Sequence, residues 1–203
     1  MGAVYLGVDN YRDGDWIGAR GRQAVRMAAG DATPADWNDI PAGYAIAISG
    51  QTGLSWIAGY SPTMADGYAL TNKAGTARSY GGWYINTAGY MTCTVSATDS
   101  AWHLAQVYCM DPSAPNRTSV VDVMDGATVL GAYTKANAFQ YSSYWVLAAF
   151  TGSVVFRFSR GNSSSLAPLQ GIFIDPWSPH CAGVPPAGAV GSTDGMDSSP
   201  SRR

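Results

Sequence analysis

The stretch from Trp102 to Pro176 most constrains the fold, because short apolar-alternating runs follow one another there and each is stopped by a turn signal. Residues alternate with a period of two and are rich in β-branched and aromatic types, which is typical of half-buried strands. Asp125-Gly126 and Thr151-Gly152 separate neighbouring runs at hairpin spacing. The pattern therefore predicts a meander of strands. The expected strands are 102–109, 117–124, 127–133, 144–150, 153–158 and 170–175.

The N-terminal half is also rich in strand patterns, although turn-forming clusters interrupt it more often. The expected strands are 4–9, 23–28, 44–49, 54–58, 79–85 and 90–95. In residues 35–40 we expect a single helical turn instead, with Thr33 as its cap and Pro34 at its first position. The whole pattern predicts an all-β, jelly-roll-like antiparallel sandwich of about ten to twelve short strands, because each half-apolar sheet must cover another.

The charged residues restrict both the fold and the partners. The chain has no glutamate, and all 14 acidic residues are aspartates, while lysine occurs only at Lys73 and Lys135. Glutamate and lysine favour helices, so their scarcity argues against helical structure. A net charge of −2 gives no basis for attracting nucleic acid, and no apolar run is long enough to span a membrane as a helix. With only 13% charged residues, the surface suits sugars or other protein faces.

The composition changes after Pro176. Residues 177–203 contain four prolines and much glycine and serine, so we expect a β-sandwich domain at 1–176 and a flexible tail at 177–203. The tail is expected to be disordered alone, or to serve as an arm that lies on a neighbouring subunit. The N-terminus shows no secretory signal, which suggests either a trimmed chain or release by another route, for instance within a virus particle.

Neither a metal nor a cofactor is expected. Cys93, Cys109 and Cys181 cannot all pair within one chain, and we expect buried free thiols. Cys93 and Cys109 are expected on neighbouring strands, so a disulfide between them stays open. No Cys/His cluster suggests zinc. The segment 9–15 resembles a calcium loop superficially, but Tyr11 breaks the alternation of ligands.

Several short sequence motifs occur in an order that resembles the order of motifs in a known module. They are Gly14-Asp-Trp-Ile-Gly18, Gly82-Trp-Tyr84, Trp102-His-Leu-Ala, Gly152-Ser-Val-Val-Phe-Arg157 and Gly171-Ile-Phe-Ile-Asp-Pro176. The order is similar to a β-sandwich accessory module of large extracellular and sugar-directed bacterial proteins, and it runs from Val4 to Pro176. The resemblance implies a jelly-roll-like domain related in architecture to carbohydrate-binding modules. It supplies no catalytic residues.

Aromatic residues divide into those expected in the core and those expected near ligands. Tryptophans within strand words are expected to fill the core: Trp16, Trp56, Trp83, Trp102 and Trp145. Aromatic residues in or beside loops could stack on a sugar ring: Trp37, Tyr60, Tyr141, Tyr144 and Trp177. The polar residues Asp111, Asn116 and Arg117 flank a loop between two strands and could hydrogen-bond a polyol. Each of these residues could instead serve the core, a turn or a subunit contact.

Two functional hypotheses follow. The first is a non-catalytic recognition module that acts outside the cell and binds a neutral or weakly acidic glycan. The alternative is a structural virion protein of a bacteriophage, such as a tail, spike or capsid-surface component, that uses the same sandwich for subunit contacts and for host attachment. In either case the chain could form a homo-oligomer or join a larger assembly through its tail. No enzymatic activity is expected, because neither His103 nor His180 accompanies a nucleophile motif.

Overall fold

In the computed structural model, residues 2–10, 14–28, 37–55, 67–110, 117–136 and 143–177 are described. These residues form sixteen strands, and every pair is antiparallel. No helix occurs among them, so none there could cross a membrane. The expected all-β class is confirmed.

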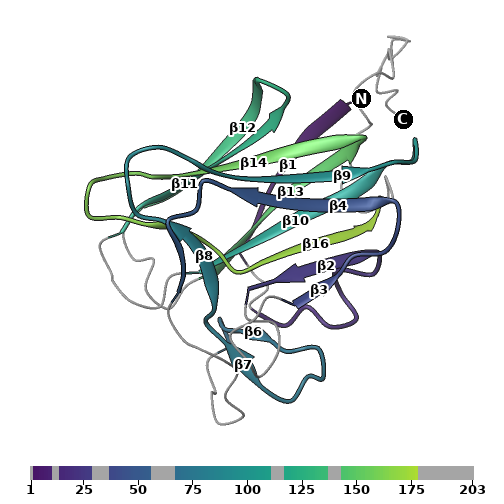
Figure 1. The fold of residues 1–203 in the computed structure, drawn as a ribbon, viewed down its shortest axis with the longest axis horizontal. Helices are drawn as coiled ribbons and strands as arrows, with labels where there is room; N and C mark the ends of the chain where they lie inside the picture. The colour runs from purple at the N-terminus through teal and green to yellow at the C-terminus, as the bar shows by residue number, and fades with distance from the viewer. Residues whose placement is uncertain are drawn as a thin grey trace, which may run out of the picture.

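Two large sheets form a sandwich (Figure 1). Sheet A has six strands in the order β1 (Gly2–Asp9), β13 (Ser143–Thr151), β10 (His103–Met110), β16 (Gly171–Pro176), β2 (Ala24–Met27) and β3 (Trp37–Asp39). Sheet B has five strands in the order β12 (Thr128–Lys135), β11 (Ser119–Asp125), β14 (Ser153–Arg160), β9 (Met91–Ala97) and β4 (Tyr44–Ser49). The number of strands in this jelly-roll-like sandwich, six in sheet A and five in sheet B, falls within the ten to twelve expected from the sequence.

Two small sheets lie beside the sandwich. One has the order β15 (Ala167–Leu169), β8 (Gly82–Ile85) and β5 (Gly53–Ser55). The other pairs β6 (Leu70–Thr71) with β7 (Arg78–Ser79), and Figure 1 shows this hairpin set apart from the two large sheets.

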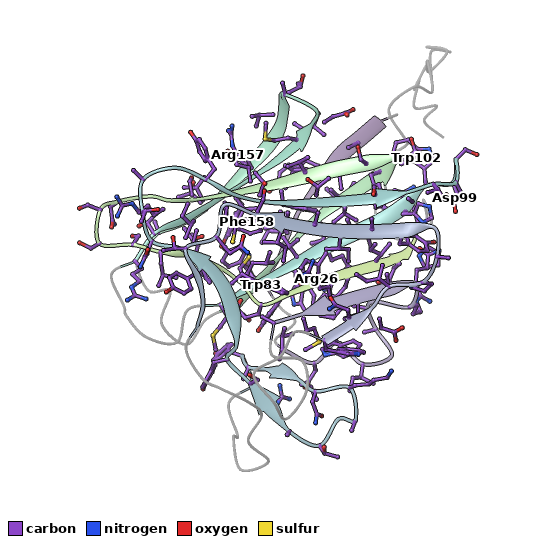
Figure 2. The ribbon with its side chains drawn as sticks, in the orientation of Figure 1. Arg26, Trp83, Asp99, Trp102, Arg157 and Phe158 are labelled. Atoms are coloured by element: carbon purple, nitrogen blue, oxygen red, sulfur yellow. The ribbon has the colours of Figure 1, made fainter. Side chains whose placement is uncertain are left out.

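The main core lies between the sheets, because alternate residues of each strand point inward. On β14, Phe156 and Phe158 are fully buried, whereas Arg157 between them is not. Figure 2 shows Arg157 and Phe158 on opposite sides of the strand. On the facing sheet, Ala105, Val107 and Cys109 of β10 are fully buried in the same core.

A second, smaller apolar cluster covers part of the outer face of sheet A. It contains Trp16, Val25, Met27, Leu70, Tyr108, Met110, Trp145 and Phe173. Because both faces of the central strands are buried there, β10 and β13 are almost continuously buried. This explains why their sequences are apolar beyond simple alternation.

An arginine connects β2 of sheet A with β4 of sheet B at one edge of the sandwich. The guanidinium of Arg26 donates to the carbonyl oxygen of Ile46 at 2.8 Å and lies 5.4 Å from the ring centroid of Trp83. Figure 2 shows Arg26 and Trp83 close to each other at this edge.

The expected helical turn at 35–40 is wrong where the structure describes it. Residues 37–39 form β3, which pairs with β2 through Met27↔Trp37. Pairing brings the ring of Trp37 to 5.6 Å from that of Trp16, and this tertiary packing outweighs the local capping signal. Thr33 and Pro34 lie outside the described residues.

The expected core tryptophans are mostly confirmed. Trp16, Trp83 and Trp145 are buried, Trp102 is half-buried, and Trp56 lies outside the described residues. The described residues end at Trp177, so the expected tail lies almost wholly outside them and stays a prediction.

Cys93 and Cys109 are both buried and free, as expected. Their placement on neighbouring strands is wrong, because β9 belongs to sheet B and β10 to sheet A. Cys181 lies outside the described residues.

Candidate functional site

The outer face of sheet A carries a pocket of about 520 Å³. Leu104 and Gln106 of β10 point toward it, because their neighbours Ala105 and Val107 point into the main core. The other residues around this pocket, called here the sheet A pocket, are Asp9, Gly18, Ala19, Arg20, Arg22, Leu147, Asp175, Pro176 and Trp177.

One wall of the pocket is the segment 14–22, which is docked firmly on the sheet. The backbone of Gly14 donates to Gly67 at 2.8 Å and accepts from Thr71 at 3.1 Å. A Cβ atom at Gly14 would lie 2.0 Å from the carbonyl oxygen of Ala69, so only glycine allows this approach. The indole of Trp16 donates to the carbonyl oxygen of Thr71 at 2.7 Å. These contacts fix the position at which Arg20 enters the pocket.

Arg20 is only 7% exposed and is held from three sides. Its Nη2 atom donates to Oδ2 of Asp9 at 2.5 Å, and its Nη1 atom donates to Oε1 of Gln106. The guanidinium carbon lies 4.1 Å from the ring centroid of Trp145. Stacking on the ring and a fixed carboxylate leave the guanidinium little freedom to reorient.

Asp175 is the second buried anion of the site. Its Oδ2 atom accepts from the backbone of Gly21 at 2.8 Å and from Nε2 of Gln106 at 2.7 Å. Its Oδ1 atom accepts from the backbone and from Nε of Arg22, at 2.9 Å and 3.1 Å. Four donors hold the carboxylate in place, and Gln106 joins it to Arg20. The two aspartates and two arginines of the pocket balance in charge.

The rest of the lining is apolar and partly accessible. Leu104, Leu147 and Trp177 are half-buried, and Pro176 is exposed. The backbone of Trp177 donates to the carbonyl oxygen of Trp102 at 3.1 Å, which ties it to the start of β10. On the polar side, Asp9 and Arg22 have side-chain exposures of 25% and 64%. The pocket thus offers both apolar contact and accessible hydrogen-bonding groups.

Three of the expected ligand residues are described and lie outside this pocket: Trp37, Arg117 and Tyr144. Trp37 is half-buried in β3, and the amine of Lys73 lies 5.2 Å from its ring centroid. Arg117 lies just before β11 and is half-buried. Four other expected ligand residues lie outside the described residues: Tyr60, Asp111, Asn116 and Tyr141.

The expectation that Tyr144 stacks on a sugar is wrong. Tyr144 is the second residue of β13 and is fully buried in the main core. Its hydroxyl donates to Oγ of Ser119 at 3.2 Å, and its ring lies 5.0 Å from that of Tyr133. Strand alternation turns this side chain inward, so no ligand can reach it.

Arg20, Gln106 and Asp175 were not predicted as site residues from the sequence. Gln106 and Asp175 are polar residues within strongly apolar strand sequences, and this contrast could have identified them as candidate site residues. Trp177 was recognised as an aromatic residue beside a strand end, and it does border the pocket.

The segment 9–15, which superficially resembles a calcium loop, does not form a metal site in its described part. Asp9 pairs with Arg20, and Asp15 pairs with Nη2 of Arg78 at 2.5 Å. Within the described residues no group of three or more His, Cys, Asp and Glu side chains could hold a metal ion.

No protein-family model matches the chain, and no curated protein matches it by sequence. Solved structures similar to it include a carbohydrate-binding module, CBM35 from Cellvibrio japonicus Abf62, at 12% identity over 87% of this chain and 95% of that chain, with a TM-score of 0.32. TmCBM61 in complex with β-1,4-galactotriose matches at 7% identity over 73% and 92% of the two chains, with a TM-score of 0.34.

The enzymatically active domain of tailspike protein 4 of bacteriophage CBA120 matches at 6% identity over 67% of this chain and 20% of that chain, with a TM-score of 0.33. Carbohydrate-binding modules, which the sequence resemblance implied, are thus among the similar structures.

Proposed function

We propose that this protein is a non-catalytic recognition module that binds a glycan in the sheet A pocket and acts outside the cell. The observation that carries the proposal is the combination of a fixed, charge-balanced polar network and an apolar wall in one pocket of about 520 Å³. Ligand pockets commonly pair an apolar lining with a few convergent polar groups.

A sugar ring matches this lining because it presents C–H groups on its faces and hydroxyls around its rim. Leu104, Leu147 and Trp177 would contact a ring face. The accessible groups of Asp9 and Arg22 would hydrogen-bond the hydroxyls. Affinity at one such site would be modest, and repetition of the module in an array would raise it.

The hydrogen bonding supports a non-catalytic role. Asp175 accepts four hydrogen bonds, and Asp9 is paired with Arg20, so both carboxylates already hold the pocket together. Assays for release of reducing ends from any glycan that binds should therefore detect no hydrolysis, and steady turnover would contradict this part of the proposal.

The binding site is tested with a glycan array followed by calorimetry on the glycans that bind. Trp177→Ala removes an apolar wall, and Leu104→Arg fills the pocket with a longer side chain; each should weaken binding at least about tenfold. The matched control is Ala47→Arg, an exposed position on β4 of sheet B, which should leave binding unchanged. Unchanged affinity in both pocket variants would refute the site, and a wild-type protein that binds no glycan would refute the function.

A structural role in a bacteriophage virion remains the second candidate, and one observation favours it. Val129 and Leu130 are exposed by 48% and 36% on β12, an edge strand of sheet B. Neighbouring exposed apolar residues on a strand edge suit a subunit contact. Light scattering should then show an oligomer that Val129→Asp dissociates, whereas a strict monomer would count against this candidate.

A further inference from the structure

A second pocket, of about 370 Å³, lies on the side of the sandwich opposite to the sheet A pocket. It is lined by Ala88, Gly89, Tyr90, Ser159 and Arg160, and we call it the Tyr90 pocket. Ser159 and Arg160 end β14, and Tyr90 immediately precedes β9; these two strands are neighbours in sheet B. The glycan proposal for sheet A does not use any of these residues.

Tyr90 is the most exposed of the large hydrophobic residues in the described chain, at 55%, yet its ring is held in place. The guanidinium carbon of Arg157 lies 4.5 Å from the ring centroid. Arg157 is itself fixed by Asp122, whose Oδ2 atom accepts from Nε at 2.9 Å and from Nη2 at 2.7 Å. One face of the tyrosine ring is thus covered by an anchored side chain, and a flat ligand can stack on the other.

The charge of the Tyr90 pocket differs from that of the sheet A pocket. Arg157 is neutralised by Asp122, whereas no carboxylate pairs with Arg160 in the described part of the chain. The Nη1 atom of Arg160 donates to the carbonyl oxygens of Asn86 and Ser163, at 3.0 Å and 2.9 Å. These bonds fix the guanidinium without cancelling its charge. A stacking face, a serine hydroxyl and one uncompensated cation therefore meet in one pocket.

We propose that the Tyr90 pocket binds a sugar ring that carries a carboxylate, such as a uronic acid. The ring stacks on the free face of Tyr90, the carboxylate pairs with Arg160, and Ser159 hydrogen-bonds a ring hydroxyl. Arginine pairs well with a carboxylate through a charge-assisted hydrogen bond, so the charge selects acidic over neutral sugars. The protein then has two sites of different charge preference on its two outer faces.

The test is an NMR titration of the full chain with glucuronate, glucose and acetate at one ionic strength. Glucuronate should bind at least about tenfold more tightly than glucose, which lacks the charge, or acetate, which lacks the ring. Amide shifts should cluster at Gly89, Tyr90, Ser159 and Arg160. Equal binding of acetate and glucuronate would reduce the pocket to a simple anion site, and shifts located elsewhere would overturn the proposal.

Substitutions separate stacking from charge. Arg160→Gln and Tyr90→Ala should each weaken glucuronate binding about tenfold, while Tyr90→Phe keeps the ring and should bind normally. Lys73→Gln is the matched control, because it removes an exposed positive charge that lines neither pocket. An equal loss in Lys73→Gln and Arg160→Gln would mean that only overall charge matters, and would overturn the proposal.

The same titration keeps the two proposals apart. Trp177→Ala should weaken glycan binding at the sheet A pocket at least about tenfold and leave glucuronate binding at the Tyr90 pocket intact. If no glycan binds at the sheet A pocket but glucuronate titrates Tyr90, only the proposed function fails. If Trp177→Ala abolishes both, the Tyr90 pocket is not an independent site. The wild-type comparison of the three ligands decides the matter even if a variant fails to fold.

Discussion

Arg20 is the residue on which the geometry of the sheet A pocket depends, because it joins β1, β10 and β13 through Asp9, Gln106 and Trp145. Removing one partner of a buried ion pair leaves the other charge uncompensated. We expect Arg20→Ala to lower the free energy of unfolding by about 3 kcal/mol, measured by urea denaturation. Arg22→Ala, at a mostly exposed position, should cost less than about 1 kcal/mol. Equal losses would contradict the role assigned to Arg20.

Asp99 and His103 form a hydrogen-bonded pair where the chain passes from sheet B to sheet A. Nε2 of His103 lies 2.7 Å from Oδ1 of Asp99, and this hydrogen bond is the main reason that the pKa of Asp99 lies below its ordinary value of 3.8; a hydrogen bond from the backbone of Ala101 adds to it. Because the folded pKa is lowered, the stability that Asp99 contributes is present above pH 3.8 and is lost as the pH falls through the lowered pKa.

The titration of Asp99 can be followed directly by NMR of its carboxyl carbon. In the wild type the midpoint should lie below 3.8, and His103→Phe should move it back toward that value. The return should be partial, because the bond from Ala101 remains. Identical midpoints in the two proteins would show that His103 does not cause the shift.

At the scale of elements, the segment 14–22 forms one wall of the sheet A pocket, and without it this face of the sheet would be open. Gly14→Ala would place a Cβ atom 2.0 Å from the carbonyl oxygen of Ala69, and the whole segment would have to move. We expect a stability loss of about 2 kcal/mol together with weaker glycan binding. The control Gly2→Ala, whose Cβ would lie 3.9 Å from Trp102, should change stability by less than about 0.5 kcal/mol. Normal binding by a stable Gly14→Ala protein would contradict the role of this segment.

The strands of the sandwich could be predicted from the sequence because alternation and turn residues act locally. The runs around β11, β12 and β14 were placed within one or two residues. β3 was not predicted, because only pairing with β2 and packing on Trp16 make a strand of a segment with a helix-capping signal. Likewise Tyr144 stands at a strand end in sequence, and only the register of β13 turns it into the core.

The polar network of the site could not be predicted for the same reason. Arg20 and Gln106 are 86 residues apart, and Gln106 and Asp175 are 69 apart. No local pattern joins them, because their contact depends on the pairing of β10 with β16 and on the docking of the segment 14–22. Trp177 was recognised because an aromatic residue after a strand end is a local feature.

At the scale of the whole molecule, the thiols report whether the sandwich opens. Burial raises the pKa of Cys93 to about 12 and also raises the pKa of Cys109. In a Cys181→Ser variant at pH 8, we expect the native protein to show no reaction with a thiol reagent and the denatured protein to show two reactive thiols. Rapid labelling of the native protein would contradict the closed core.

The two outer faces of the sandwich carry pockets that differ in charge. Sheet A carries a pocket with balanced charge, and sheet B carries the Tyr90 pocket with an uncompensated arginine. The closed core between them holds both faces in a fixed relation. The domain should therefore recognise its ligands without a large rearrangement, with segment 14–22 already in place before a glycan arrives.

Mapping of amide shifts with a glycan selected from the array tests the central claim most directly. The proposed function predicts saturable shifts at Leu104, Gln106, Leu147 and Trp177, with none at the exposed alanines Ala45 and Ala47 of β4. Shifts confined to sheet B, or to residues distant from the segment 14–22, would contradict the claim that the sheet A pocket is the glycan site.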